Sequence, residues 1–221
     1  MAVPERVVIS GAGCCTALGH DLDSVARSLR EGRDAFRASG ALEGLSVCPA
    51  EDWGQDEARQ QFEGWRHRHY LNRGSRMAVL SGLRALRDVG LEAGLPVRSQ
   101  IIAAVGPMLD VTGEPGLPPQ DTATLGALWL LRWLPNTAAG ALARFARCHG
   151  EALTVNAACA SALQALGEGW RRIRFGLADA VLVTAGDSRL SLGGLLGYHK
   201  ARALSLCAPG TGPRPFDMGR D

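Results

Sequence analysis

The segment Leu153-Thr-Val-Asn-Ala-Ala-Cys159-Ala-Ser-Ala-Leu163 joins a short apolar run to a helix-like run through small residues, and it places a cysteine at the junction. This pattern is typical of a strand that turns directly into a helix. The start of a helix presents free backbone N–H groups and the positive end of the helix dipole, which favour negative charge on a thiolate or on a developing oxyanion. Cys159 is therefore a candidate nucleophile, and the alternative is a small buried side chain that only packs.

Strand-like and helix-like segments alternate along the rest of the chain. Short β-branched or apolar runs predict strands at residues 6–10, 100–105, 152–156 and 178–185. Apolar residues at helical spacing predict helices at residues 21–30, 75–89, 125–134, 137–147 and 161–175. Residues 33–70 are expected to form a loop with room for one short charged helix. The alternation predicts an α/β layered fold, and one domain over residues 1–221 is the simplest organisation.

The composition argues against several classes of function. The chain has 221 residues, of which 46% are hydrophobic, and this is enough for a packed core. Because 24 Lys+Arg face 22 Asp+Glu, the formal charge is only +2, and no general positive field would hold nucleic acid or an anionic membrane. No apolar run in the sequence reaches the roughly 18–20 residues that span a bilayer, so we expect a soluble, cytoplasmic protein.

Neither the cysteines nor the first glycines carry a metal or cofactor signature. The six cysteines contain no Cys-x-x-Cys pair, so neither disulfides nor a structural zinc site is expected. Gly11 and Gly13 follow the first predicted strand, but Thr16 stands where the dinucleotide-binding pattern needs a third glycine. A nucleotide cofactor is therefore not expected.

Four further motifs lie in a fixed order around the Cys159 segment. Arg6-Val-Val-Ile-Ser-Gly-Ala-Gly13 and Leu134-Pro-Asn-Thr-Ala-Ala-Gly140 precede it, and Gly176-Leu-Ala-Asp-Ala-Val-Leu-Val-Thr-Ala-Gly186 and Arg214-Pro-Phe-Asp-Met-Gly-Arg-Asp221 follow it. Together these segments resemble the β-ketoacyl-ACP synthases, or ketosynthases, over almost the whole chain. Ala157 is a departure, since the family's nucleophile segment has a threonine there.

The resemblance implies a thiolase-like fold, with residues 1–221 as the amino-terminal half of an α-β-α-β-α layered architecture that dimerises along the strand near residues 153–156. It also implies that Cys159 takes an acyl chain from an acyl carrier protein for decarboxylative condensation in fatty acid or polyketide biosynthesis, with no cofactor. The two histidines that support this chemistry belong to the family's second half. None of the five histidines of this chain lies in the family's histidine motifs.

Two interpretations of the chain stay open. It is either a half-length subunit that resembles a chain-length factor or a piece of a longer enzyme, and an autonomous condensing enzyme is not expected. In the first case a ketosynthase chain would be its homo- or heterodimer partner, and the chain itself could be a noncatalytic subunit that stabilises an active ketosynthase and shapes its acyl tunnel. Cys159 argues against a pure chain-length factor, where this position is usually glutamine.

The resemblance also suggests surfaces for substrate and partner. Met108, Leu109 and Trp129 fall near positions that line the family's acyl pocket, although ordinary core packing explains them equally well. A local group of arginines could meet an acidic carrier protein, although solvated surface arginines are the more common case: Arg66, Arg68, Arg73 and Arg76. The family covers the helix after Cys159 with its second half, so this half alone would leave an apolar stripe bare: Leu163, Ala165, Leu166 and Trp170.

Overall fold

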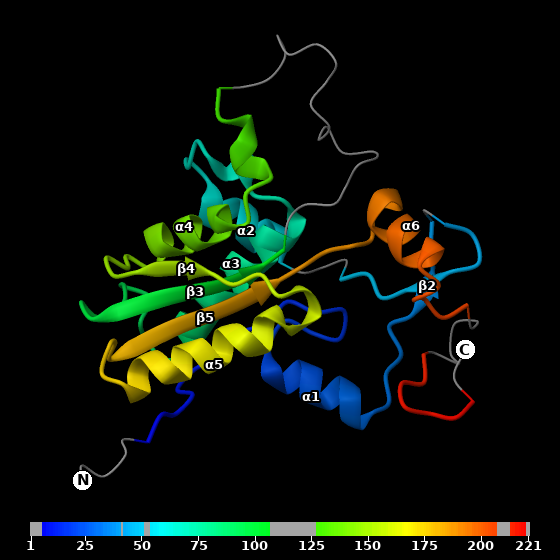
Figure 1. Cartoon of the computed structure of the whole chain (residues 1–221), viewed down its shortest axis with the longest axis horizontal. Helices are drawn as coiled ribbons and strands as arrows, with labels where there is room; N and C mark the ends of the chain where they lie inside the picture. The colour runs from blue at the N-terminus through cyan, green and yellow to red at the C-terminus, as the bar shows by residue number, and fades with distance from the viewer. Residues whose placement is uncertain (1–5, 41, 51–53, 107–126, 207–212, 220–221) are drawn as a thin grey trace.

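The computed structural model describes residues 6–40, 42–50, 54–106, 127–206 and 213–219. Within these residues a parallel three-stranded sheet has the order β4-β3-β5, built from Ala152–Thr154, Ser99–Val105 and Ala180–Gly186 (Figure 1). The register places Ile102 of β3 beside Leu153 of β4 and Val183 of β5. Because all three strands run in the same direction, their carboxyl ends meet at one edge of the sheet.

The described residues also form six helices. They are α1 (Leu22–Arg30), α2 (Gln55–Phe62), α3 (Arg73–Asp88), α4 (Asn136–Phe145), α5 (Ser161–Arg174) and α6 (Leu192–Lys200). Three of them, α3, α4 and α5, contact the sheet. Short 3-10 turns lie at η1 (Arg68–Tyr70), η3 (Trp129–Arg132) and η4 (Ala158–Ala160). A small antiparallel pair is formed by β1 (Arg37–Ala38) and β2 (Ser46–Val47).

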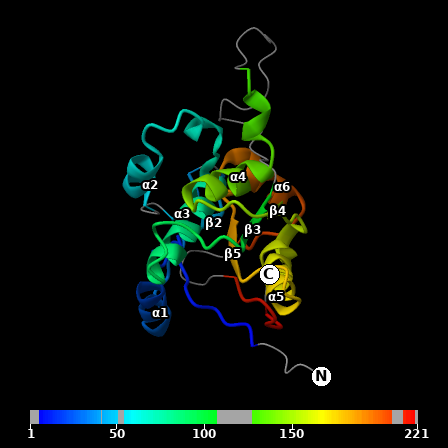
Figure 2. The same ribbon diagram turned by 90° about the vertical axis from the view of Figure 1, so that its left-hand side faces the viewer.

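The sheet lies between two helical layers, with α3 and α4 on one face and α5 on the other (Figure 2). This arrangement follows from the middle strand β3, whose side chains alternate between two cores with the period of two expected of a strand. Ile101, Ala103 and Val105 pack into the larger core with α3 and α4. Ile102 and Ala104 pack into a smaller core with Ala165 of α5. A strand covered on both faces explains the continuous apolar run in the sequence.

Local sequence sets the ends of the helices. Asp21 caps α1 by accepting the Ser24 N–H at 2.7 Å, and the Ser24 hydroxyl reaches back toward it, which forms a capping box. Asn72 caps α3 by accepting the Ser75 N–H at 2.8 Å. These caps confirm the predicted helices near residues 21–30 and 75–89.

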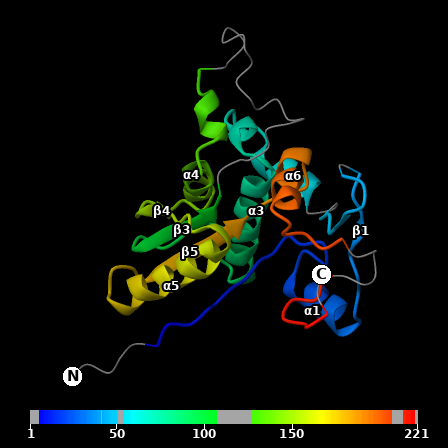
Figure 3. The same cartoon turned by 45° about the vertical axis from the view of Figure 1, so that its right-hand side comes forward.

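The predicted strand at residues 6–10 is wrong, because the structure shows an extended segment that pairs with no strand among the described residues. Val8 and Ile9 are 67% and 75% exposed. The β-branched run has no ladder to join, and the chain is held instead by the glycines that follow it, which approach α3 closely. Ala12 donates its N–H to Asp88 of α3 at 3.0 Å. Figure 3 shows this segment running below α5 toward α3.

Three further differences concern short elements. The helix predicted at residues 125–134 is reduced, in the described residues from 127 onward, to the 3-10 turn η3. The loop predicted at residues 33–70 contains α2, the one charged helix expected there, and also the β1–β2 pair, whose two-residue strands are too short to give a periodic signal. Helix α6 was not predicted, since its three glycines disfavour a helix in isolation.

Candidate functional site

Cys159 lies at the turn that joins β4 to α5, as the sequence predicts. The strand pairing with β3 continues one residue past β4, where the Val155 N–H donates to the Ala103 carbonyl at 3.0 Å. The chain then bends through η4 and enters α5 at Ser161. Cys159 is exposed and carries a free thiol. The turn therefore holds the sulfur at the carboxyl edge of the sheet, where it is open to solvent.

The backbone of this turn contains an unfavourable conformation. Ala158, directly before the cysteine, has a φ of 49°. An L-residue other than glycine rarely adopts this left-handed region, because its Cβ crowds the carbonyl oxygen, at a cost of about 1–2 kcal/mol. Such a conformation persists only where neighbouring contacts hold it.

The side chain of Ser161 supplies those contacts. Its hydroxyl oxygen accepts the Ala157 N–H at 2.7 Å, and the hydroxyl donates to the Ala158 carbonyl, also at 2.7 Å. Ser161 is only 9% exposed. The Ala160 N–H donates to the Ala157 carbonyl at 3.1 Å, so the peptide groups around Ala158 are fixed on both sides.

The turn also leaves hydrogen-bond donors near the sulfur. A helix offers no internal acceptor to the N–H groups of its first turn, and η4 begins at Ala158, so the N–H of Cys159 belongs to this class. Donors of this kind can hold the oxyanion that forms when a thiolate attacks a carbonyl carbon. The geometry thus suits nucleophilic attack on an acyl group.

Of the other residues predicted for the site, only Trp129 lies in the described part of the chain, and it belongs to a different segment from the turn. Met108 and Leu109 lie outside the described residues. Trp129 begins η3 and is half-buried, and η3 packs against η1, whereas η4 packs against α5. The structure therefore associates the Trp129 segment with the region around residues 68–70.

The arginine group predicted near η1 divides into two pairs. Arg66 and Arg68 are exposed, and the Arg68 guanidinium donates to the Trp65 carbonyl at 3.3 Å. Arg73 and Arg76 are half-buried in the first turns of α3, and Arg73 donates to the Ala50 carbonyl at 2.8 Å. Only the first pair is exposed.

Comparison with known proteins identifies the family and the fold of the chain. The profile described as "Beta-ketoacyl synthase, N-terminal domain" matches residues 4–219. The chain belongs to the β-ketoacyl synthase family. Cys159 lies at the strand-to-helix turn inside the segment of residues 153–163, and the thiolase-like α/β fold expected from the motifs is confirmed.

The chain matches curated relatives over almost its whole length. It is 25% identical to the 3-oxoacyl-[acyl-carrier-protein] synthase 2 of Vibrio harveyi, over 98% of this chain and 54% of that protein. It is 27% identical to Nodulation protein E of Rhizobium leguminosarum bv. trifolii, over 98% of this chain and 54% of that protein. The chain thus spans about half the length of the curated relatives that it matches.

Solved structures show the same fold. The ishigamide ketosynthase/chain length factor superposes with a TM-score of 0.79 at 24% identity, over 99% of this chain and 55% of that chain. A type II PKS ketosynthase in complex with its acyl-carrier protein superposes with a TM-score of 0.65 at 16% identity, over 90% of this chain and 55% of that chain. At these identities the likeness establishes the fold of this ketosynthase chain and nothing finer.

Two kinds of feature are absent from the part of the chain that the structure describes. No group of three or more His, Cys, Asp or Glu side chains there could hold a metal ion. No helix in the same residues is long and apolar enough to cross a membrane.

Sequence reasoning on this ketosynthase chain missed Ser161 and the left-handed Ala158. A serine two residues after the cysteine and at the first position of the helix was the available signal. Its meaning depends on the Ala158 backbone, and alanine gives no sign of a positive φ.

Proposed function

We propose that this chain supplies the nucleophile of a ketosynthase-type acyl transferase of fatty acid or polyketide biosynthesis. The Cys159 sulfur attacks the carbonyl carbon of an acyl thioester on an acyl carrier protein. A new C–S bond to Cys159 forms, the carrier's C–S bond breaks, and the carrier thiol leaves with the proton that Cys159 loses. The observation that carries the proposal is the exposed thiol at the β4-to-α5 turn, in a chain matched by the family over residues 4–219.

We also propose that condensation requires a second polypeptide segment, which is either a partner ketosynthase subunit or a further half of the same protein. Two features of the surface support this. The outer face of α5 is apolar, with Leu163, Leu166 and Trp170 exposed to 75%, 44% and 49%. In addition, β4 is one of the two edge strands of the sheet, and its outer edge pairs with no other strand among the described residues.

The proposed acyl donor is an acidic carrier protein. Arg66 and Arg68 of this chain form an exposed pair of positive charges beside η1. Such a pair would attract an acidic carrier protein, because complementary charge speeds the encounter of two proteins. The free thiols of Cys14, Cys15, Cys48, Cys148 and Cys159 fit a reducing compartment, and we place the reaction in the cytoplasm.

The bare face of α5 also favours a second candidate function. In this alternative the chain is a noncatalytic subunit that resembles a chain-length factor, stabilises an active ketosynthase and shapes its acyl tunnel. It requires the apolar stripe on α5 but not the Cys159 sulfur.

Reconstitution separates the two candidates. The chain is combined with a ketosynthase subunit that carries the family's histidine motifs, and condensation of acyl- and malonyl-carrier protein is measured for the wild type and for Cys159→Ala. If Cys159 is the nucleophile, the variant should lose about a hundredfold or more of the turnover that depends on this chain. If turnover still requires the chain but is the same in Cys159→Ala, the noncatalytic alternative holds.

A further inference from the structure

The serine that follows the candidate nucleophile is bonded unlike the helix caps elsewhere in the described chain. Asp21, Asn72 and Ser191 each precede a helix and accept an N–H from three residues further along it. Ser161 is the first residue of α5 and its hydroxyl points backward, to the N–H of Ala157 and the carbonyl of Ala158. It therefore acts on the turn before the helix and not on the open end of its own helix.

The two bonds enclose the strained residue. The buried Ser161 hydroxyl bonds the N–H of Ala157 and the carbonyl of Ala158, each at 2.7 Å. Ala158 therefore cannot leave its left-handed conformation without breaking at least one of these bonds. Ser161 is only 9% exposed, so water does not compete for either hydrogen bond. The two bonds therefore favour a single geometry of the turn. The direction of the Cβ of Cys159, one residue later, follows from that geometry.

We infer that Ser161 is a positioning residue that clamps the Ala157–Ala158 turn and thereby holds the Cys159 sulfur and its neighbouring N–H groups in the arrangement that acyl transfer needs. The inference rests on the proposed role of Cys159 and extends it to a residue that does not touch the substrate. A displacement of about 1 Å at a reacting atom is enough to cost about a hundredfold in rate.

Removal of the hydroxyl tests the clamp directly. In Ser161→Ala the Ala157 N–H loses its acceptor, and its hydrogen–deuterium exchange should become about tenfold faster or more. Ser161→Thr keeps the hydroxyl and should keep slow exchange. Ser28→Ala is the matched control, since Ser28 is 2% exposed and donates to the Leu18 carbonyl at 2.8 Å, far from the turn in sequence.

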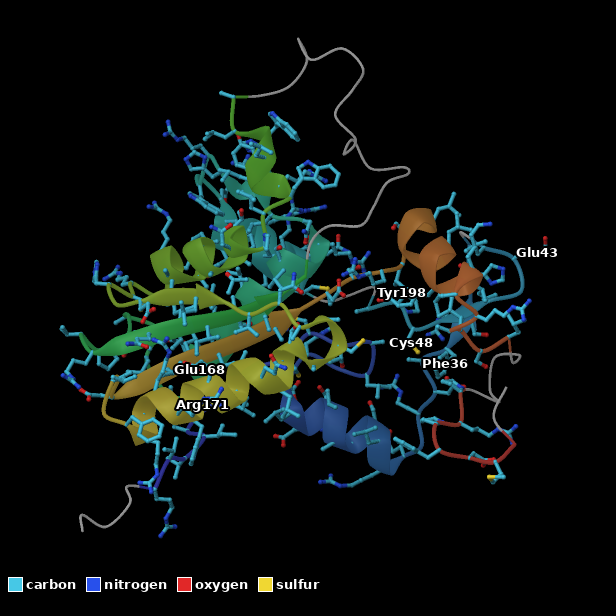
Figure 4. All side chains as sticks on the ribbon, viewed as in Figure 1. Phe36, Glu43, Cys48, Glu168, Arg171 and Tyr198 are labelled. Carbon is cyan, nitrogen blue, oxygen red and sulfur yellow. The ribbon has the colours of Figure 1, made fainter. Side chains whose placement is uncertain are left out.

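The second readout is the reactivity of Cys159. Acyl transfer from an acyl-carrier protein and alkylation by iodoacetamide are followed on the Cys159 peptide, with the exposed Cys48, which lies near β2 (Figure 4), as an internal reference. Ser161→Ala should lower both rates relative to Cys48 by about tenfold, through kcat more than KM for the acyl donor, and Ser161→Thr should recover most of the loss. Ser28→Ala should leave both rates unchanged.

The outcomes separate this inference from the proposed function. Unchanged exchange at Ala157, or faster exchange with unchanged Cys159 reactivity, overturns the positioning role of Ser161. If the wild type accepts no acyl group, the proposed function fails, and amide exchange together with alkylation of Cys159 still decides whether Ser161 holds the sulfur.

Discussion

At the scale of single residues, Arg84 of α3 joins three segments that are distant in sequence. Its Nε and Nη2 donate to Glu57 of α2 at 3.1 and 2.6 Å, and its Nη1 donates to the carbonyls of Cys14 and His20 at 2.8 and 3.3 Å. The side chain of Arg84 is 13% exposed, so its charge depends on these partners. Loss of one partner of a buried pair costs more than the pair contributes, because it leaves a charge without compensation.

Glu57 should therefore matter to stability in a pH-dependent way. Burial raises the pKa of its carboxyl group, but hydrogen bonds from Arg84 and Arg87 outweigh this and hold the pKa below the ordinary 4.5. Because the folded pKa is lower than the unfolded one, the stabilisation is fully present above pH 4.5 and is lost as the pH falls through the folded pKa. Glu57→Gln should destabilise the fold by about 1–3 kcal/mol at pH 7, and by progressively less below pH 4.

Urea unfolding of the wild type and of Glu57→Gln at pH 7 and at pH 3 checks this prediction. The control is Asp56→Asn, which removes an exposed carboxylate paired with Arg59 at 3.4 Å and should change stability by less than about 0.5 kcal/mol. A cost of Glu57→Gln that is the same at pH 7 and at pH 3 would show that the charge of Glu57 contributes nothing.

The residue scale also shows how far sequence reasoning reaches at the site. The place of Cys159 at the strand-to-helix turn could be predicted, because an apolar run precedes the cysteine and a helical pattern follows it. The clamp by Ser161 could not, since it depends on two hydrogen bonds to backbone groups whose direction is set by the φ of Ala158. The packing of Trp129 could not be predicted either. Its place near the family's pocket-lining positions did not reveal that its segment, η3, packs on η1.

At the scale of elements, helix α4 ends in a Schellman motif. The Cys148 N–H donates to the Ala143 carbonyl at 2.9 Å and the Arg147 N–H to the Arg144 carbonyl at 3.3 Å. Arg147, which directly precedes Cys148, has a φ of 48°. Glycine is the usual residue here because it has no Cβ to oppose this conformation.

Arg147→Gly should consequently stabilise the protein. The left-handed conformation no longer carries its steric cost, and after the larger unfolded-state entropy of glycine is subtracted, a gain of about 0.5–1 kcal/mol is expected in thermal or urea unfolding. The comparison variant is Arg144→Gly, three residues earlier and inside α4, where glycine should instead cost about 1 kcal/mol. Equal effects of the two substitutions would contradict the account of this helix end.

The elements that sequence periodicity predicted best are those whose own pattern matches their burial. Four elements begin and end within about two residues of the predicted bounds: β3, β5, α3 and α5. Covered strands and amphipathic helices have a clear pattern of apolar residues in the sequence, which makes them predictable. The segment at residues 6–10 has an equally clear strand pattern, yet it is unpaired in the described structure. Strand formation requires a neighbour, and a single run of residues does not reveal whether one exists.

At the scale of the whole molecule, α5 carries apolar side chains on two opposite faces, of which only one is buried in the described structure. Ala165 packs fully against the sheet, while Leu163, Leu166 and Trp170 point to solvent along the opposite face. Glu168 and Arg171, which form an ion pair at 3.0 Å, lie beside each other on this helix (Figure 4). The sequence-based expectation of a bare apolar stripe is confirmed for three of its four residues, and Ala165 is the exception because it faces the core.

Leu163→Gln should weaken the association of this chain with a ketosynthase partner by about tenfold while leaving its own stability nearly unchanged. The reason is that Leu163 is 75% exposed in the chain alone, so its burial contributes only when a partner covers α5. Analytical ultracentrifugation of the mixed chains measures the affinity. Gln164→Ala alters the neighbouring exposed position and should not change it. Undiminished binding by Leu163→Gln would place the interface elsewhere.

Acylation of Cys159 tests the central claim most directly. The purified chain is incubated with an acyl-carrier protein thioester, with and without a ketosynthase partner, and intact-protein and peptide mass spectrometry locate any added acyl group in the wild type and in Cys159→Ala. The account predicts one acyl adduct on the Cys159 peptide that is absent from the variant. The absence of any adduct under both conditions, or an adduct that persists in Cys159→Ala, would contradict it.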